Sequence, residues 1–212
     1  MTEMETRGQF QRQFEALGGH FFYVAGRDVL PQVLAAAYQE MVDRYVPDIP
    51  LQVVYWLDSE FREWDLGEIL GAVRGTRCIP WPQGGWDQAV QGEWRSRLAE
   101  SQVGITGAAW AAADTGTVAL YASPGEGLLP SLLMPVHLVL MNQNRIHPSV
   151  GDGLKWLYQR GQDHGMLPPL VKLITGPSMT ADIEGQLVIG VHGPAAIGVF
   201  VYGFEDGEGG SG

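Results

Sequence analysis

Apolar residues recur at helical spacing in the first nineteen residues of the chain. Phe10, Phe14 and Leu17 fall on one face of this segment, which ends at a pair of glycines. The pattern predicts an amphipathic helix over about residues 3–17. Because its polar face is continuous, we expect this helix to pack on the outside of the domain.

The same spacing predicts two more helices in the first half. Asp28 is the expected N-cap of a helix that stops before Pro47. Asp65 and Glu68 have the spacing of a capping box ahead of a short helix that ends near Gly75. Residues 81–92 are rich in glycine and proline and are typical of a long connection.

Short runs of β-branched and aromatic residues alternate with these helices and continue beyond them. One further long helix is expected, at about 149–162. The predicted strands are residues 21–25, 51–57, 103–106, 117–122, 136–141, 170–174, 187–190 and 197–202. This alternation predicts an α/β fold with a mixed, largely parallel sheet. We expect residues 1–203 to form a single domain and the polar residues 204–212 to be a disordered tail.

Charge and composition exclude several classes of partner. With 13 basic and 24 acidic residues the net charge is −11, and Lys155 and Lys172 are the only lysines. Such a chain has no basic surface for nucleic acid. No apolar run approaches the ~18 residues of a membrane span, and no signal peptide is evident at the start. We therefore expect a cytoplasmic protein without a membrane span.

The chain offers little for a metal or a nucleotide phosphate. Neither lysine stands in a P-loop, and the sequence around Gly151 and Gly153 lacks the last glycine of a dinucleotide fingerprint. The five histidines are scattered without ligand spacing, so no bound metal is expected. The single cysteine, Cys78, is too few for an iron–sulfur cluster, which needs about four thiolates.

Two stretches combine polar side chains with flexible backbone beside predicted strands. The first consists of Gly104–Gly107 followed by Asp114–Thr117, and the second runs from Gly176 to Glu184. Glycines allow close approach of a ligand, hydroxyls donate hydrogen bonds, and carboxylates exchange protons. Asp182 and Glu184 would point to the same side of an extended segment, which raises the pKa of one of them. The alternative is a hydrogen-bonded turn network that holds strand ends together.

The candidate site residues follow from these stretches and from two histidines near strand ends. Ligands of open α/β sheets bind outside strand ends, so we expect the segments to converge on one cleft. The candidate catalytic residues are Asp182, Glu184 and Asp114. The candidate ligand-binding residues are Gly104, Thr106, Gly107, Thr115, Gly116, Thr117, His137, Gly176, Ser178, Thr180, His192 and Gly193.

These motifs, in this order, resemble the LUD-domain family. The resemblance is carried by residues 104–106, 114–117, 131–137 (Ser-Leu-Leu-Met-Pro-Val-His), 176–184 and 190–194 (Gly-Val-His-Gly-Pro). It implies a three-layer α/β/α sandwich like that of ribose-5-phosphate isomerase, glucosamine-6-phosphate deaminase and the CoA-transferases. It also implies a part in oxidising lactate to pyruvate together with partner proteins that carry iron–sulfur clusters.

The chain departs from the family pattern at two positions. Asp114 stands where many relatives have Glu, and Leu128 stands where an arginine often precedes the Ser-Leu-Leu-Pro segment. An arginine there would hold a carboxylate or phosphate. The nearest basic alternative is Arg145, which could equally be a solvated loop charge.

Three functions remain open at this level. The first is a component of a lactate-oxidising complex that takes its redox centre from iron–sulfur subunits. The second is a freestanding enzyme acting on a sugar phosphate or a CoA ester. The third is a non-catalytic regulatory or binding module for a small molecule. The fold alone does not decide among them.

Overall fold

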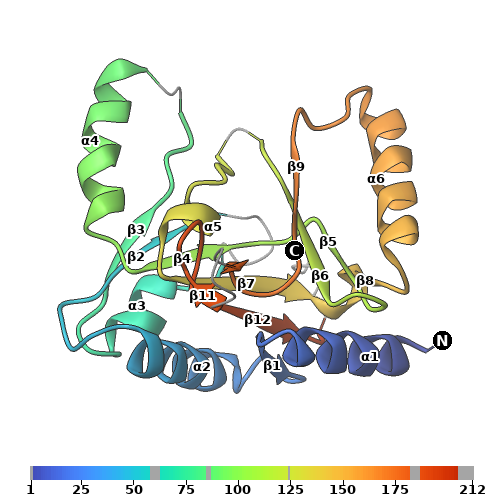
Figure 1. Cartoon of the computed structure of the whole chain (residues 1–212), viewed down its shortest axis with the longest axis horizontal. Coiled ribbons are helices and arrows are strands. Elements are labelled where there is room, and N and C mark those ends of the chain that lie inside the picture. Colours follow the sequence, from blue (N-terminus) through green and yellow to red (C-terminus); the bar gives the residue numbers. More distant parts are fainter. Residues whose placement is uncertain (1, 58–62, 85–86, 124, 182–186, 205–212) are drawn as a thin grey trace, which may run out of the picture.

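A six-stranded parallel sheet runs through the centre of the molecule (Figure 1). The structure is a computed structural model that describes residues 2–57, 63–84, 87–123, 125–181 and 187–204. Every strand pair in this sheet is parallel. In spatial order the strands are β1 (His20–Val24), β12 (Ala196–Tyr202), β7 (Val136–Asn142), β4 (Val103–Thr106), β2 (Gln52–Tyr55) and β3 (Arg77–Pro80).

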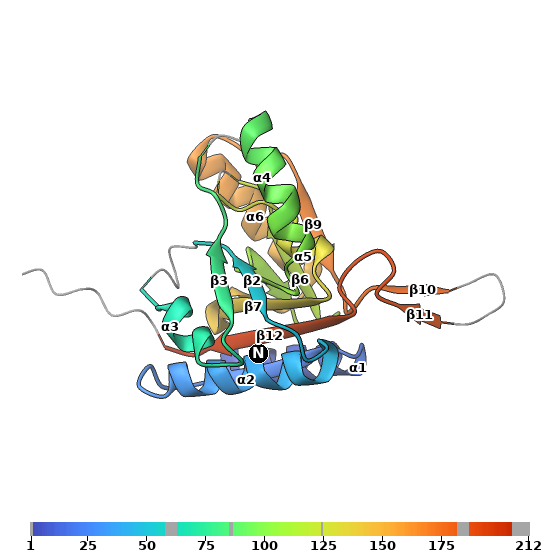
Figure 2. The same cartoon turned by 90° about the vertical axis from the view of Figure 1, so that its left-hand side faces the viewer.

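The antiparallel pairs belong to two smaller sheets rather than to the central one. A four-stranded sheet has the order β8 (Ile146–His147), β5 (Trp110–Ala112), β6 (Thr117–Tyr121) and β9 (Val171–Ile174). A hairpin of β10 (Met179–Ala181) and β11 (Leu187–Ile189) projects from the body (Figure 2). The sequence predicted one sheet with both parallel and antiparallel pairs. Instead, the antiparallel pairs lie outside the central sheet, because β5 and β6 form a hairpin over the central sheet and do not join it.

Helices cover both faces of the central sheet, which confirms the three-layer α/β/α architecture (Figures 1 and 2). One face carries α1 (Glu3–Ala16), α2 (Leu30–Tyr45) and α3 (Leu66–Gly71). The other carries the four-stranded sheet with α4 (Gln88–Ala99), α5 (Pro130–Leu133) and α6 (Val150–His164). In the described part of the chain, none of these helices has the length and apolar character needed to cross a bilayer.

Burial on both faces explains the sequence of the central strands. Every residue of β12 is buried, and so are the first six residues of β7. Strands covered on both faces have continuous apolar runs instead of alternating ones. The predicted strands at 136–141 and 197–202 are therefore confirmed almost to the residue.

Local sequence patterns did not predict every helix and helix cap correctly. Helix α4 begins within residues 81–92, which were expected to be a connection, and only Trp94 and Leu98 of its described side chains are buried. The N-cap of α2 is Val29, which makes no side-chain cap hydrogen bond, so the expected cap at Asp28 is wrong. Asp65 does cap α3 by accepting a hydrogen bond from Glu68 N at 2.9 Å. The expected disordered tail falls almost wholly outside the described residues.

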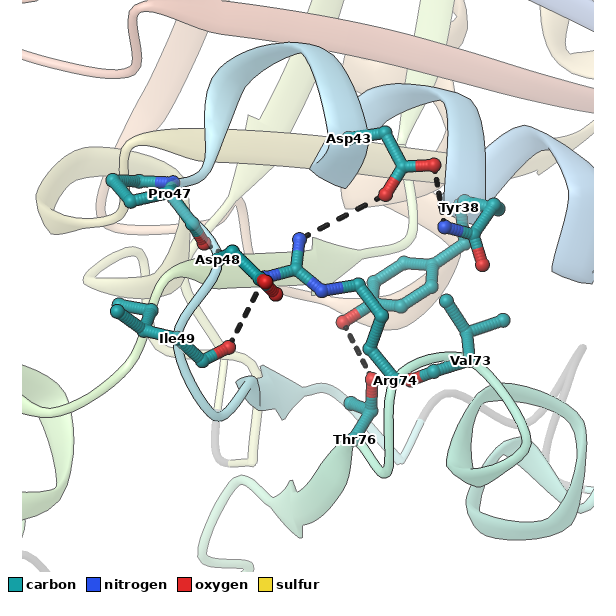
Figure 3. A network of polar contacts seen from close by, with 9 residues as sticks. Tyr38, Asp43, Pro47, Asp48, Ile49, Val73, Arg74 and Thr76 are labelled. Atoms are coloured by element: carbon teal, nitrogen blue, oxygen red, sulfur yellow. Dashed lines mark hydrogen bonds and ion pairs between the residues drawn. The ribbon is translucent and has the colours of Figure 1, made fainter.

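One arginine ties two connections together on the α2 side of the sheet (Figure 3). Arg74 Nη2 donates to Pro47 O at 2.7 Å, to Asp48 Oδ1 at 3.1 Å and to Ile49 O at 3.2 Å. Its side chain is 18% exposed, and its backbone has a left-handed φ of 51°. The clamp joins the α2–β2 connection to the turn before β3, so it ties β2 to the neighbouring edge strand β3.

We expect Arg74→Gln to lower the free energy of unfolding by about 2 kcal/mol, because hydrogen bonds from a charged donor to two carbonyls and a carboxylate are lost. Chemical denaturation measures this. Arg95→Gln removes the same charge from an exposed position on α4 and is the matched control. Equal stability of the two variants would contradict the clamp.

Candidate functional site

A buried hydrogen-bonded pair lies on the face of the central sheet opposite α2. Thr106 ends β4, and its Oγ1 is 2.8 Å from Nε2 of His137 on the neighbouring strand β7. Both side chains are fully buried, and Nδ1 of His137 has no hydrogen-bond partner among the described residues. Burial, with a smaller contribution from Lys172, lowers the pKa of His137 to about 3. The imidazole is therefore neutral at physiological pH.

Lys172 lies on β9 of the four-stranded sheet, and its side chain reaches α5, the helix beside this pair. Its Nζ donates to Ser131 O at 2.7 Å and to Ser131 Oγ at 3.0 Å, and the Ser131 hydroxyl donates to Leu128 O at 2.7 Å. Burial lowers the pKa of Lys172 to about 8. Because Ser131 is fully buried and its proton is directed at a carbonyl, it is not an available nucleophile.

Gly104 is required by packing rather than by a ligand at its own position. A Cβ at Gly104 would lie 1.9 Å from Pro130 O, so the backbone of α5 rests directly on β4. Gly104 is also the register partner of His137. Gly107, just beyond the end of β4, is buried as well.

A second polar group gathers where β6, β9 and α1 meet. Thr117 Oγ1 lies 2.8 Å from Thr115 Oγ1 and 2.9 Å from Thr175 Oγ1. Asp114 is exposed and accepts from Thr115 Oγ1 at 3.3 Å. Gly116 has a φ of 65°, and a Cβ there would lie 2.7 Å from Phe14 N. This turn is therefore fastened to the backbone of α1.

The segment after β9 joins the same group. Gly176 has a φ of 88° and packs on Leu17 O at the end of α1. Ser178 N donates to Pro194 O at 2.9 Å, which ties the segment to the residues preceding β12. A Cβ at Gly193 would lie 3.2 Å from Ser178 Cβ, whereas His192 is exposed.

The structure brings together some candidate residues and separates others. Residues 114–117, 175–178 and 190–194 form one network near the amino ends of β1 and β12, where α1 stops. Thr106 and His137 form a separate pair, and no hydrogen bond between described residues joins it to that network. Thr180 lies in β10, while Asp182 and Glu184 lie outside the described residues. Their assignment, and that of one shared cleft, stays a prediction.

A polar cavity of about 70 Å³ lies at the opposite, carboxyl edge of the central sheet. Its walls include Trp56, Ala108 and Arg145, which follow the adjacent strands β2, β4 and β7. From β2 the chain proceeds to β3 on one side, whereas the sheet strand after β4 is β7 on the other side. The cavity thus lies at the point of strand-order reversal, where open α/β sheets bind their ligands.

Two arginines and one glutamate give this cavity its charge. Arg145 ends a 3₁₀ turn, η1 (Gln143–Arg145), and its Nη1 donates to Ala108 O at 3.1 Å and Ala109 O at 3.4 Å. Arg160 enters from α6, and Glu126 enters from the β6–α5 connection. Glu126 accepts a hydrogen bond from the Ser123 hydroxyl. Two guanidinium groups against one carboxylate leave a site that favours an anion.

The sequence singled out only one of these residues. Arg145 was recognised as a basic alternative to the missing family arginine, and the structure places it in the cavity wall rather than in a solvated loop. Trp56, Tyr121, Glu126 and Arg160 carry no motif, because they come from four separate segments. Only the strand order brings them together.

No metal centre is formed by the described residues, since no group of three His, Cys, Asp or Glu side chains lies close enough to hold an ion. Burial, aided by Asp65, raises the pKa of the Cys78 thiol to about 11. A protonated thiol is a poor metal ligand and a poor nucleophile.

The LUD domain sequence model matches residues 8–202. The chain belongs to the LUD domain family. Among curated LUD relatives, it is 31% identical over 161 residues to "Lactate utilization protein C" of Shouchella clausii, covering 76% of this chain and 65% of the relative. The protein of the same name in Bacillus velezensis is 39% identical over 139 residues, covering 65% and 56%.

The chain spans about half to two thirds of the length of the curated relatives that it matches. An Escherichia coli relative, "Uncharacterized protein YkgG", is 35% identical over 109 residues, which are 51% of this chain and 47% of the relative. A crystal structure of a DUF162 family protein from Deinococcus radiodurans superposes with a TM-score of 0.63 over 96% of this chain and 99% of that one. At 19% identity, this likeness shows the shared LUD fold alone.

We expect Gly104→Ala to be strongly destabilising, by about 3 kcal/mol or more, because its Cβ would overlap a backbone oxygen that cannot move without α5. Gly92→Ala, on α4 with open space around its Cβ, should instead be neutral or stabilising by up to about 1 kcal/mol. Thermal unfolding of the two variants tests this. A Gly104→Ala protein as stable as the wild type would show that α5 does not rest on β4.

His137 should make the protein sensitive to mild acid. Its pKa is lower in the folded than in the unfolded state, so stability is lost as the pH falls from about 6.5 toward 3, by up to about 1.4 kcal/mol per pH unit. His137→Asn should flatten this slope between pH 6.5 and 5, measured by urea unfolding. The control is His192→Asn at an exposed position, which should keep the wild-type slope. An unchanged slope in His137→Asn would refute the prediction.

Proposed function

We propose that this chain takes part in lactate utilisation, binding a 2-hydroxy or 2-oxo carboxylate at the carboxyl edge of the central sheet. The names of the relatives in Shouchella clausii and Bacillus velezensis support the biological role. The observation that carries the binding site is the cavity with Arg145, Arg160 and Glu126 at the point of strand-order reversal. We further propose that the protein acts in the cytoplasm.

The charges of this cavity suit the functional groups of lactate. A guanidinium group binds a carboxylate through parallel N–H donors, and Arg145 and Arg160 supply two such groups. Glu126 supplies a carboxylate that accepts a hydrogen bond from a 2-hydroxyl group. A cavity of about 70 Å³ has room for a small organic acid, since about 10–15 Å³ of such space already holds one water molecule.

The redox step itself is assigned to partner proteins. Oxidation of lactate to pyruvate releases two electrons and two protons, and the electrons need an acceptor. With Cys78 as its single cysteine, the chain lacks the roughly four thiolates of a cluster. We propose that it presents the acid to subunits that carry iron–sulfur clusters, that these clusters accept the two electrons, and that the two protons pass to solvent.

Binding measurements test the site directly. Isothermal titration of the wild-type protein with lactate and pyruvate should give saturable binding. Arg145→Gln and Arg160→Gln should each weaken it about tenfold or more, because a charge-assisted hydrogen bond contributes about 1.5–3 kcal/mol. Arg95→Gln, on an exposed part of α4, should bind like the wild type.

The same titration separates the competing functions. Binding of a sugar phosphate or a CoA ester, with no binding of lactate, would replace the proposal with a freestanding enzyme of the same fold group. Affinity purification from the host tests the partners. If the protein is recovered without any iron–sulfur protein, and the deletion strain grows normally on lactate, the proposed lactate-oxidising complex is refuted.

A further inference from the structure

An apolar groove adjoins the charged cavity at the carboxyl edge. It has a volume of about 270 Å³ and lies between the end of β6, the helix α6 and the connection that follows it. Leu157, Met166, Leu167 and Pro168 contribute carbon atoms to its walls. Met166 is 76% exposed and Leu167 is 49% exposed, so both present apolar surface at the groove.

The groove and the cavity share two residues. Tyr121 and Arg160 line both, so the charged end and the apolar end meet at these side chains. The guanidinium carbon of Arg160 lies over the ring of Trp156, 5.5 Å from its centroid. A ligand anchored by its carboxylate at Arg145 and Arg160 would therefore direct its remaining atoms past Tyr121 and into the groove.

We infer that this site takes 2-hydroxy or 2-oxo acids with an apolar side chain of several carbons, and binds them more tightly than it binds lactate. The inference rests on the proposed function, since it assumes that the carboxylate occupies the charged cavity. The occupant of the groove is the alkyl chain of the same acid. Lactate, with its single methyl group, leaves the groove unused.

The magnitude follows from apolar burial. Each methylene that moves from water into an apolar site contributes a factor of about four in affinity when it is fully buried. The groove is open on one side, so we expect about a two- to fourfold gain for each added methylene. Binding of 2-hydroxyhexanoate should then exceed binding of lactate by about tenfold or more.

The experiment is a calorimetric series with lactate, 2-hydroxybutyrate, 2-hydroxypentanoate and 2-hydroxyhexanoate. Leu167→Ser removes an apolar wall at an exposed position and should flatten the dependence on chain length, while lactate affinity stays within about twofold. Leu173→Ser is the matched control, because Leu173 is 48% exposed on β9 and lines neither cavity. Melting temperatures of both variants exclude a folding defect as the cause.

The possible outcomes separate the inference from the proposed function. If lactate binding depends on Arg145 but affinity does not rise with chain length, the inference is overturned and the proposed function stands. A gain that persists in Leu167→Ser overturns it as well, because the chain then lies elsewhere. If the series is flat and Leu167→Ser alters the oligomeric state, the groove is an interface between copies of the chain. No binding of any acid removes both proposals.

Discussion

The arrangement of the sheet face opposite α2 depends on the close contact between α5 and β4. With no side chain at Gly104, Pro130 O rests where a Cβ would stand, so the short helix lies directly on the sheet. That position brings Ser131 within reach of Lys172, and it covers the face where His137 and Thr106 share a hydrogen bond. It also carries the preceding connection, with Glu126, over the carboxyl edge. The absence of a side chain at Gly104 thus sets how closely α5 approaches the sheet.

The two edges of the sheet divide structural and chemical roles. At the amino edge, threonine hydroxyls bond to one another and glycines pack the turns against α1. At the carboxyl edge, two guanidinium groups and one carboxylate line a small polar cavity. The same residue types that suggest a site in sequence serve packing at one edge, and charged residues without any motif form the cavity at the other. This contrast explains why polar, glycine-rich motifs were an incomplete guide.

The pattern of apolar residues predicted the fold well, whereas the location of the candidate site became visible only from the order of the strands in the sheet. The run Val136–Met141 was identified as a strand because both of its faces are buried. Helix α4 was missed because its sequence is mostly polar, and propensity alone could not outweigh the glycines around it. Arg145 was noticed only as a basic residue near a family motif. Its meeting with Arg160 and Trp56 depends on the reversal between β2 and β4, which no local pattern records.

The pairing of β1 with β12 has a consequence for how the chain is made. His20 lies opposite Gly198, so the first strand of the sheet bonds only to the last. At about 5–20 residues per second, a ribosome needs roughly 10–35 s to produce the intervening chain. Throughout that time β1 has no neighbouring strand in the central sheet, whereas α2 can already pack on β7. The edge strand β1 can therefore join the sheet only after β12 has been synthesised, so the central strands are the part of the sheet that can assemble first.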